Sequence, residues 1–180
     1  MTRRSGNGGE GIQIRAEAQG DRKAVDAMLR AAFGGDGESR LVERLRKGDD
    51  LIVSLVADSA GDVVGHIALS RALVSGDSDL EIAWLAPLAV RPDRQGEGIG
   101  SSLVYAGMDV CLGLGLTHAV VVGDPDYYGR FGFSAEEARG LASRFQGSAL
   151  QLIDMTHAAP PLSGRLSEPD AFMELEPQAG

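Results

Sequence analysis

Residues 90–100 read VRPDRQGEGIG and join the end of an apolar strand, through a glycine-rich turn, to the start of a helix. The first N–H groups of a helix lack partners within the helix and carry the positive end of its dipole. Glycines let a diphosphate come close to those amides, and Arg91 and Arg94 add local positive charge. The stretch therefore predicts a diphosphate-binding loop, although a tight strand-to-helix turn without a ligand would contain the same glycines.

Two other kinds of phosphate loop fit these residues less well. A Walker loop requires a lysine after its last glycine, and the stretch contains none. A Rossmann fingerprint that uses Gly96 and Gly98 requires a third glycine where Ser101 stands. Asp124 does follow the strand expected at residues 118–122, where that fingerprint has its acidic residue. A small dinucleotide-binding protein therefore remains an alternative.

The hydrophobic pattern on both sides of this loop indicates an α/β fold. Apolar residues alternate with polar ones in the expected strands, and they recur every three to four residues in the expected helices. The strands are expected at residues 12–17, 51–57, 63–69, 80–90, 118–122 and 150–154. The helices are expected at residues 21–33 (capped by Asp21), 39–48 (capped by Ser39), 100–113 and 127–131. Early hairpins and a later crossover predict a mixed, mostly antiparallel sheet flanked by helices.

Pro87 interrupts the long apolar strand that leads into the loop. Proline has no backbone N–H, so it indicates a bulge or a point at which ladder pairing stops. The backbone groups that lose their ladder partners there must bond to something else.

Composition limits the class of protein. The chain has 180 residues, of which 43% are hydrophobic, and this is enough to bury the core of one domain. A formal net charge of −9 argues against nonspecific nucleic-acid binding, and no apolar run is long enough for a membrane span. The single cysteine, Cys111, excludes an internal disulfide, so a cytoplasmic location is expected. The three histidines are isolated in the sequence, so no metal site is expected.

Two motifs resemble the GNAT superfamily of N-acetyltransferases. Residues 95–100, QGEGIG, are similar to its Q/R-x-x-G-x-G/A signature, and residues 88–92, LAVRP, resemble the strand that precedes it. Residues 123–133, GDPDYYGRFGF, resemble its Y-x-x-x-G-F segment, and are most similar to the bacterial YhbS-like branch. The resemblance covers residues 12–152. We expect a domain at residues 12–158, after a flexible arm at 1–11 and before a mostly irregular segment at 159–180.

The resemblance implies a cofactor site in a sheet that is splayed between two central strands. Acetyl-CoA would be the acyl donor, with its pantetheine arm paired to the backbone of one strand and its pyrophosphate on the amides of the loop. The strand residues are Leu88, Ala89 and Val90; the loop residues are Gln95, Gly96, Glu97, Gly98, Ile99, Gly100 and Ser101.

The resemblance also implies how the acetyl group would reach a primary amine of a small molecule or peptide, by direct attack through a tetrahedral intermediate. Tyr128 stands where the motif has the acid that protonates the leaving thiolate; the alternative is a tyrosine that only packs against the cofactor. Tyr127 is expected to point elsewhere. Parts of the superfamily have a glutamate base where this chain has Trp84, so Glu81, three residues earlier, is the substitute candidate.

The acceptor is not specified by the motifs. In the superfamily its site is built from the first helices and the late loops, here residues 33–46 and 135–146. Four acidic residues there could attract a cationic amine: Asp36, Glu38, Glu136 and Glu137. The absent carboxylate at Trp84 keeps open a noncatalytic acyl-CoA-binding or sensor domain. Homodimers are common in the superfamily, which leaves a homodimer open here.

Overall fold

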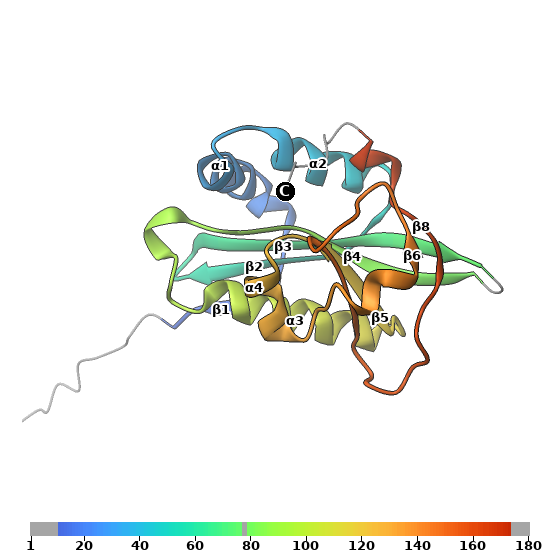
Figure 1. Cartoon of the computed structure of the whole chain (residues 1–180). Helices are drawn as coiled ribbons and strands as arrows, with labels where there is room; N and C mark the ends of the chain where they lie inside the picture. Colours follow the sequence, from blue (N-terminus) through green and yellow to red (C-terminus); the bar gives the residue numbers. More distant parts are fainter. Residues whose placement is uncertain (1–10, 77–78, 174–180) are drawn as a thin grey trace, which may run out of the picture.

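The computed structural model describes residues 11–76 and 79–173, and Figure 1 shows a central sheet with helices on both faces. Six strands cross the sheet in the order β1 (Gln13–Ala16), β2 (Leu51–Ser59), β3 (Asp62–Ser75), β4 (Leu80–Val90), β5 (His118–Val122) and β7 (Leu150–Asp154). Two short strands extend it, since β8 (Gly164–Ser167) pairs with β3, and β6 (Leu141–Ala142) pairs with β8. β4 and β5 run parallel, as do β6 and β8, and the other pairs are antiparallel. The predicted mixed, mostly antiparallel α/β fold is confirmed.

Helices α1 (Arg22–Phe33) and α2 (Gly37–Lys47) cover one face of the sheet, and α3 (Ile99–Gly113) covers the other (Figure 1). The short helix α4 (Pro125–Tyr128) follows β5. Each long helix buries an apolar stripe, such as Val25, Met28 and Leu29 of α1. Short 3-10 helices span Gln19–Asp21, Pro92–Arg94, Gly129–Phe131, Glu137–Gly140 and Asp170–Phe172.

Two predicted helix caps were wrong. α2 begins at Gly37, so Ser39 lies inside the helix, where its hydroxyl donates a hydrogen bond to Asp26 of α1. Asp21 does precede α1, but its carboxylate makes no cap because it binds the guanidinium of Arg15 and the N–H of Ala18. At Ser39 a contact with the neighbouring helix replaced the local bond that the residue type favours, and at Asp21 bonds to two residues just before it in the chain replaced that bond.

The described C-terminal segment is less irregular than expected. The strand at residues 150–154 is not the last one, because β8 follows it and pairs with the far end of β3. Phe172, beyond β8, packs on the buried ring of Trp84 with ring centroids 5.2 Å apart. The expected arm at residues 1–11 lies outside the described residues except for Gly11. The division into an arm, one domain and a C-terminal segment stays a prediction.

β4 leaves its neighbours at the position of Pro87. Ile67 of β3 pairs with Leu88, and Leu69 pairs with Leu85, so β4 has one residue more than β3 across this step. On the other side, the pairing of β5 with β4 covers Ala83–Leu85 and ends there. The predicted break at Pro87 is therefore confirmed, and beyond Leu85 no strand among residues 11–76 and 79–173 pairs with the edge of β4 that faces β5.

A polar cluster lies under α2. Glu17, which follows β1, is 5% exposed and forms an ion pair with Arg46 of α2. Its carboxylate also accepts a hydrogen bond from Ser54 of β2, whose Oγ lies 2.9 Å from Nε2 of the buried His66. Burial by itself would raise the pKa of Glu17, but interactions with His66, whose Nε2 lies 3.6 Å from the carboxylate, and with Arg46 and Ser54 lower that pKa to about 2.

None of the helices in the described part of the chain has the length and apolar character needed to span a bilayer.

Replacing Glu17 with Gln should lower the free energy of unfolding by about 3 kcal/mol near neutral pH, because the largely buried Arg46 loses its carboxylate. Glu17 has a folded-state pKa below its ordinary value of 4.5, so its stabilising effect is complete above that pH and is lost as the pH falls toward 2. Urea unfolding of both proteins near pH 7, 5 and 3 should show a difference that shrinks on acidification. A constant difference would contradict the ionised pair.

Candidate functional site

The loop after β4 takes the conformation that its glycines allow. Gly96 and Gly98 have φ angles of +82° and +81°, in the left-handed region that other residues rarely adopt. A Cβ atom at either position would meet nothing within 4 Å, so both glycines border open space. The side chain of Gln95 turns back and donates a hydrogen bond to the carbonyl of Val90. The loop therefore presents backbone, rather than side chains, at the start of α3.

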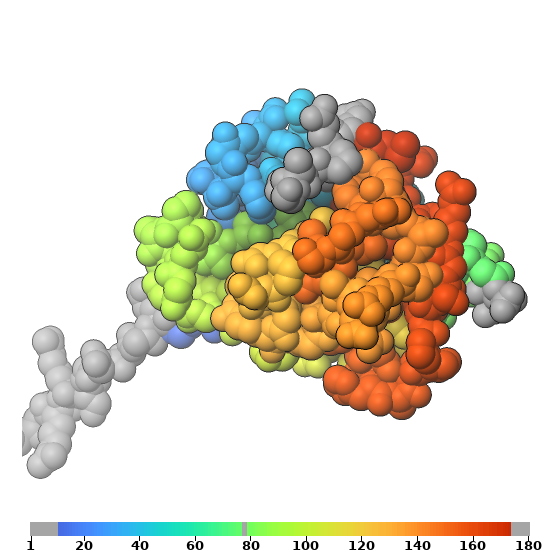
Figure 2. All heavy atoms as spheres, in the orientation of Figure 1, coloured from blue at the N-terminus to red at the C-terminus, as the bar shows by residue number. Residues whose placement is uncertain are grey.

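A cavity of about 590 Å³ brings the two sequence motifs together. Its walls come from the separated end of β4, the glycine loop and α4, and Figure 2 shows the loop and the α4 segment on the same face of the molecule. The lining residues are Leu88, Val90, Arg94, Gln95, Gly96, Gly98, Ile99, Gly100, Ser101, Asp124, Tyr127, Tyr128 and Arg130.

Two of the expected cofactor residues do not line this cavity. Ala89 packs on the opposite face of the sheet with residues of α1, as strand alternation requires between Leu88 and Val90. Glu97 points its carboxylate at Arg94, with an N–O distance of 3.0 Å. Both residues could still contribute backbone groups, and their role in binding stays a prediction.

Arg130 supplies positive charge to the cavity. Its guanidinium lies 4.5 Å from the ring centroid of Tyr127, and its Nε donates to the Tyr127 carbonyl. Within residues 11–76 and 79–173 it forms no ion pair with a carboxylate, whereas Arg94 is paired with Glu97. An anion in the cavity would therefore meet an uncompensated cation, which sequence reasoning did not single out.

Tyr128 reaches the cavity from α4 with its ring against Gly123. A Cβ atom at Gly123 would lie 2.4 Å from Cε2 of this ring, so only glycine permits the contact. The ring also packs edge-on against Phe133, with centroids 5.8 Å apart. Burial raises the pKa of Tyr128 well above its usual value, so the phenol holds its proton at neutral pH.

Tyr127 does not point elsewhere, and that expectation was wrong. Its hydroxyl lies over the first turn of α3, 2.6 Å from where a Cβ atom of Gly100 would be. Burial raises the pKa of Tyr127 too, so it also presents a neutral hydroxyl. The two tyrosines thus border the same cavity, with their rings at an interplanar angle of 80°. A signal was present in the sequence, since Gly100 leaves room for a side chain from elsewhere.

Glu81 does not lie with these residues. Its carboxylate accepts two hydrogen bonds of 2.9 Å from Arg71 of β3, and it is not part of the cavity lining. Trp84, which stands where parts of the superfamily have a glutamate, is a fully buried ring. Glu81 as base therefore stays a prediction.

The expected acceptor acids are spread over two regions. Asp36 pairs with Arg40 at 3.0 Å, and Glu136 pairs with Arg139 at 3.4 Å, so both are partly neutralised. Residues 11–76 and 79–173 contain no group of three His, Cys, Asp or Glu side chains placed to hold a metal ion.

The family profile of the acetyltransferase (GNAT) family matches residues 22–133, from α1 through the glycine loop to the Tyr128 segment. The chain belongs to the GNAT family. It is 40% identical over 136 residues to the N-acetyltransferase YhbS of Escherichia coli K12, which covers 75% of this chain and 81% of YhbS. The N-acetyltransferase YjhQ of the same organism is 38% identical over 105 residues, which covers 57% of this chain and 58% of YjhQ.

Two solved GNAT structures resemble this one over most of its length. The crystal structure of E. coli YhbS in complex with CoA has a TM-score of 0.87 and 33% identity, and covers 95% of this chain and 97% of that one. A GNAT family acetyltransferase from Brucella melitensis in complex with acetyl-CoA has a TM-score of 0.76 and 32% identity, and covers 91% of this chain and 99% of that one.

Changing Gly100 to Ala tests the position of Tyr127 in this GNAT protein. The new Cβ would clash with the hydroxyl oxygen at 2.6 Å, but the ring carbon Cζ is 3.8 Å away. We therefore expect Gly100→Ala alone to lower the free energy of unfolding by about 1–2 kcal/mol. With Tyr127→Phe the clash disappears, and the alanine should become neutral or stabilising, because it suits a helix better than glycine. Urea unfolding of the wild type, Gly100→Ala, Tyr127→Phe and the double variant measures the coupling between the two positions. If the two substitutions have additive effects on the free energy of unfolding, the contact is contradicted.

Proposed function

We propose that this protein is an acyl-CoA-dependent N-acetyltransferase that transfers an acetyl group from acetyl-CoA to a primary amine. The observation that carries the proposal is the cavity in which the unpaired edge of β4, the glycine loop and Tyr128 meet. The β4 edge offers a strand-like partner for the amide-containing arm of acyl-CoA, and the glycine loop offers backbone amides for its diphosphate. Tyr128 offers a proton donor for its sulfur. The CoA and acetyl-CoA in the two related crystal structures support the same donor here.

Backbone groups of the protein would bind the cofactor at both ends of the cavity. The pantetheine arm would pair with the free edge of Leu88–Val90, where β5 no longer does, and the diphosphate would lie on the amides between Gln95 and Ser101. Arg130 is the uncompensated cation beside that position, and the Tyr127 hydroxyl offers a further hydrogen-bond donor there.

The reaction would then follow from the groups around the thioester. The lone pair of a neutral amine attacks the carbonyl carbon, and a backbone N–H near Leu88–Val90 stabilises the oxyanion. As the intermediate collapses, the C–S bond breaks and the sulfur takes the phenol proton of Tyr128. The amine nitrogen gives up its own proton to a base, and Tyr128 regains one from solvent. Glu81 lies outside the cavity lining, so it would act through water.

A noncatalytic acyl-CoA-binding or sensor domain is the second candidate. It is favoured by Trp84, a buried ring at the position where relatives in the superfamily can have a base, and by the pairing of Glu81 with Arg71. Turnover distinguishes the two, because a sensor would bind acetyl-CoA but would not acetylate any amine of a broad library.

Gly98 offers a matched test of cofactor binding. Asp and Asn tolerate the left-handed backbone better than most residues, and a Cβ atom at this position would meet nothing within 4 Å. Gly98→Asp should weaken acetyl-CoA binding in calorimetry by about 100-fold or more, since its carboxylate repels the diphosphate, while Gly98→Asn should cost about tenfold or less. Equal effects, or a wild-type preference for NAD over acetyl-CoA, would contradict this cofactor site.

Tyr128→Phe tests the acid. The ring contacts with Gly123 and Phe133 remain, so the dissociation constant for acetyl-CoA should stay unchanged while kcat falls by about 100-fold. Tyr105→Phe is the control, because Tyr105 is 53% exposed on α3 and does not line the cavity. Unchanged kcat in Tyr128→Phe would reduce this tyrosine to a packing role.

A further inference from the structure

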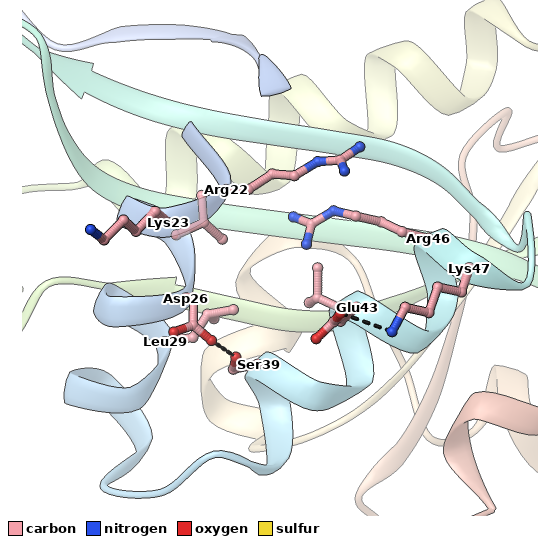
Figure 3. A pocket seen from close by; sticks show the side chains of 10 residues that line it. Arg22, Lys23, Asp26, Leu29, Ser39, Glu43, Arg46 and Lys47 are labelled. Carbon is pink, nitrogen blue, oxygen red and sulfur yellow. Dashed lines mark hydrogen bonds and ion pairs between the residues drawn. The ribbon is translucent and has the colours of Figure 1, made fainter. Parts of the chain in front are cut away.

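A second hollow, of about 430 Å³, lies between α1 and α2 and shares no lining residue with the cofactor cavity. Its apolar side chains, Val25, Leu29 and Val42, are almost fully buried and form the floor. Its charged side chains come from the first half of α1 and the second half of α2 (Figure 3). They are Arg22, Lys23, Asp26, Glu43, Arg46 and Lys47.

The acidic side chains of this hollow already have partners. Asp26 accepts hydrogen bonds from Arg30 and Ser39, and Glu43 lies 2.9 Å from the ammonium group of Lys47. Arg22 makes no hydrogen bond or ion pair with any residue in the described ranges, 11–76 and 79–173. The positive charge of Arg22 is therefore left uncompensated, although the whole chain carries a formal net charge of −9.

Arg46 is fixed in place on the other side of the hollow. Its side chain is 18% exposed, and its Nη2 binds the buried carboxylate of Glu17. Its Nε and Nη1 make no hydrogen bond with a described residue, and neither belongs to the buried side-chain atoms without a partner. These donors are therefore open to a ligand, and Figure 3 shows Arg22 and Arg46 extending toward the same space between the helices.

The helix that carries Arg22 adds to the positive potential. The first turn of α1 holds Arg22 and Lys23 but no acidic residue, at the end where the helix dipole is positive. Asp21, which could have balanced it, has its carboxylate on Arg15 instead. The positive charges of Arg22, Lys23 and the helix N-terminus repel one another, and a bound anion would reduce this repulsion.

We propose that this hollow binds the phosphate monoester group of a small molecule, held between Arg22 and Arg46. A phosphate monoester carries about two negative charges near neutral pH and three acceptor oxygens, which suits two guanidinium groups that approach from opposite sides. Because residues 34–36 join α1 and α2 at their other ends, the bound phosphate ties together the two ends that the chain leaves separate.

Inorganic phosphate is the probe, titrated by calorimetry at constant ionic strength into the full chain with and without saturating 3′-dephospho-CoA, which keeps the diphosphate of CoA but lacks its phosphate monoester. This compound would fill the proposed cofactor site without competing for the hollow, so phosphate binding that remains belongs elsewhere; the titration without it still reports on the hollow if it does not bind. Arg22→Gln tests the site. Arg40→Gln is the matched control, because Arg40 lies on α2 outside the hollow and is paired with Asp36.

Phosphate should bind the wild type and Arg40→Gln alike when each is saturated with 3′-dephospho-CoA, and its affinity for Arg22→Gln should be at least tenfold weaker. Arg22 has no partner among the described residues, so its replacement should leave the thermal midpoint without ligand unchanged or slightly raised. Equal phosphate affinity in Arg22→Gln and wild type, or no binding by wild type, would overturn the site. Tighter binding of acetate than of phosphate would overturn the assignment to a phosphate group.

Discussion

The site depends on the separation of β4 from β5. The two strands pair only at Ala83–Leu85, and Pro87 cannot continue the ladder because it has no N–H to donate. Beyond that point β4 still pairs with β3 on one edge, and no strand in the described part of the chain pairs with its other edge. A backbone edge inside a protein must find partners, so this separation creates both the space and the hydrogen-bonding need that an extended ligand can satisfy.

Two glycines connect this opening to the tyrosines. Gly100 lacks the Cβ that would collide with the Tyr127 hydroxyl, and Gly123 lacks the one that would collide with the Tyr128 ring. Each missing side chain is replaced by a phenol from α4, so the glycine loop and the tyrosine segment form one surface although they are far apart in the sequence. The conformation of the loop and the placement of the tyrosines are therefore mutually dependent.

Features with local causes could be predicted from the sequence, and features with tertiary causes could not. The break at Pro87 follows from the chemistry of one residue, and the helix after Gly98 follows from hydrophobic spacing. Ser39 looks like a cap, but it lies within α2 because Asp26 on the neighbouring helix accepts its hydroxyl. β8 has one buried side chain, Leu166, so no alternation marked it, and it forms because the long β3 offers an edge. The direction of Tyr127 depends on Gly100: the glycine indicates room for a side chain from elsewhere, but no local pattern identifies Tyr127 as that side chain.

Trp84 gives this arrangement an optical consequence. It is the chain's single tryptophan, and it lies on β4 next to Leu85, where the strands part. Phe145 of the late loop and Phe172 near the C-terminus enclose its ring, at centroid distances of 5.5 Å and 5.2 Å. Its indole emission therefore reports, without any label, whether both segments are seated on the sheet, since water reaching the ring would shift the emission to longer wavelength.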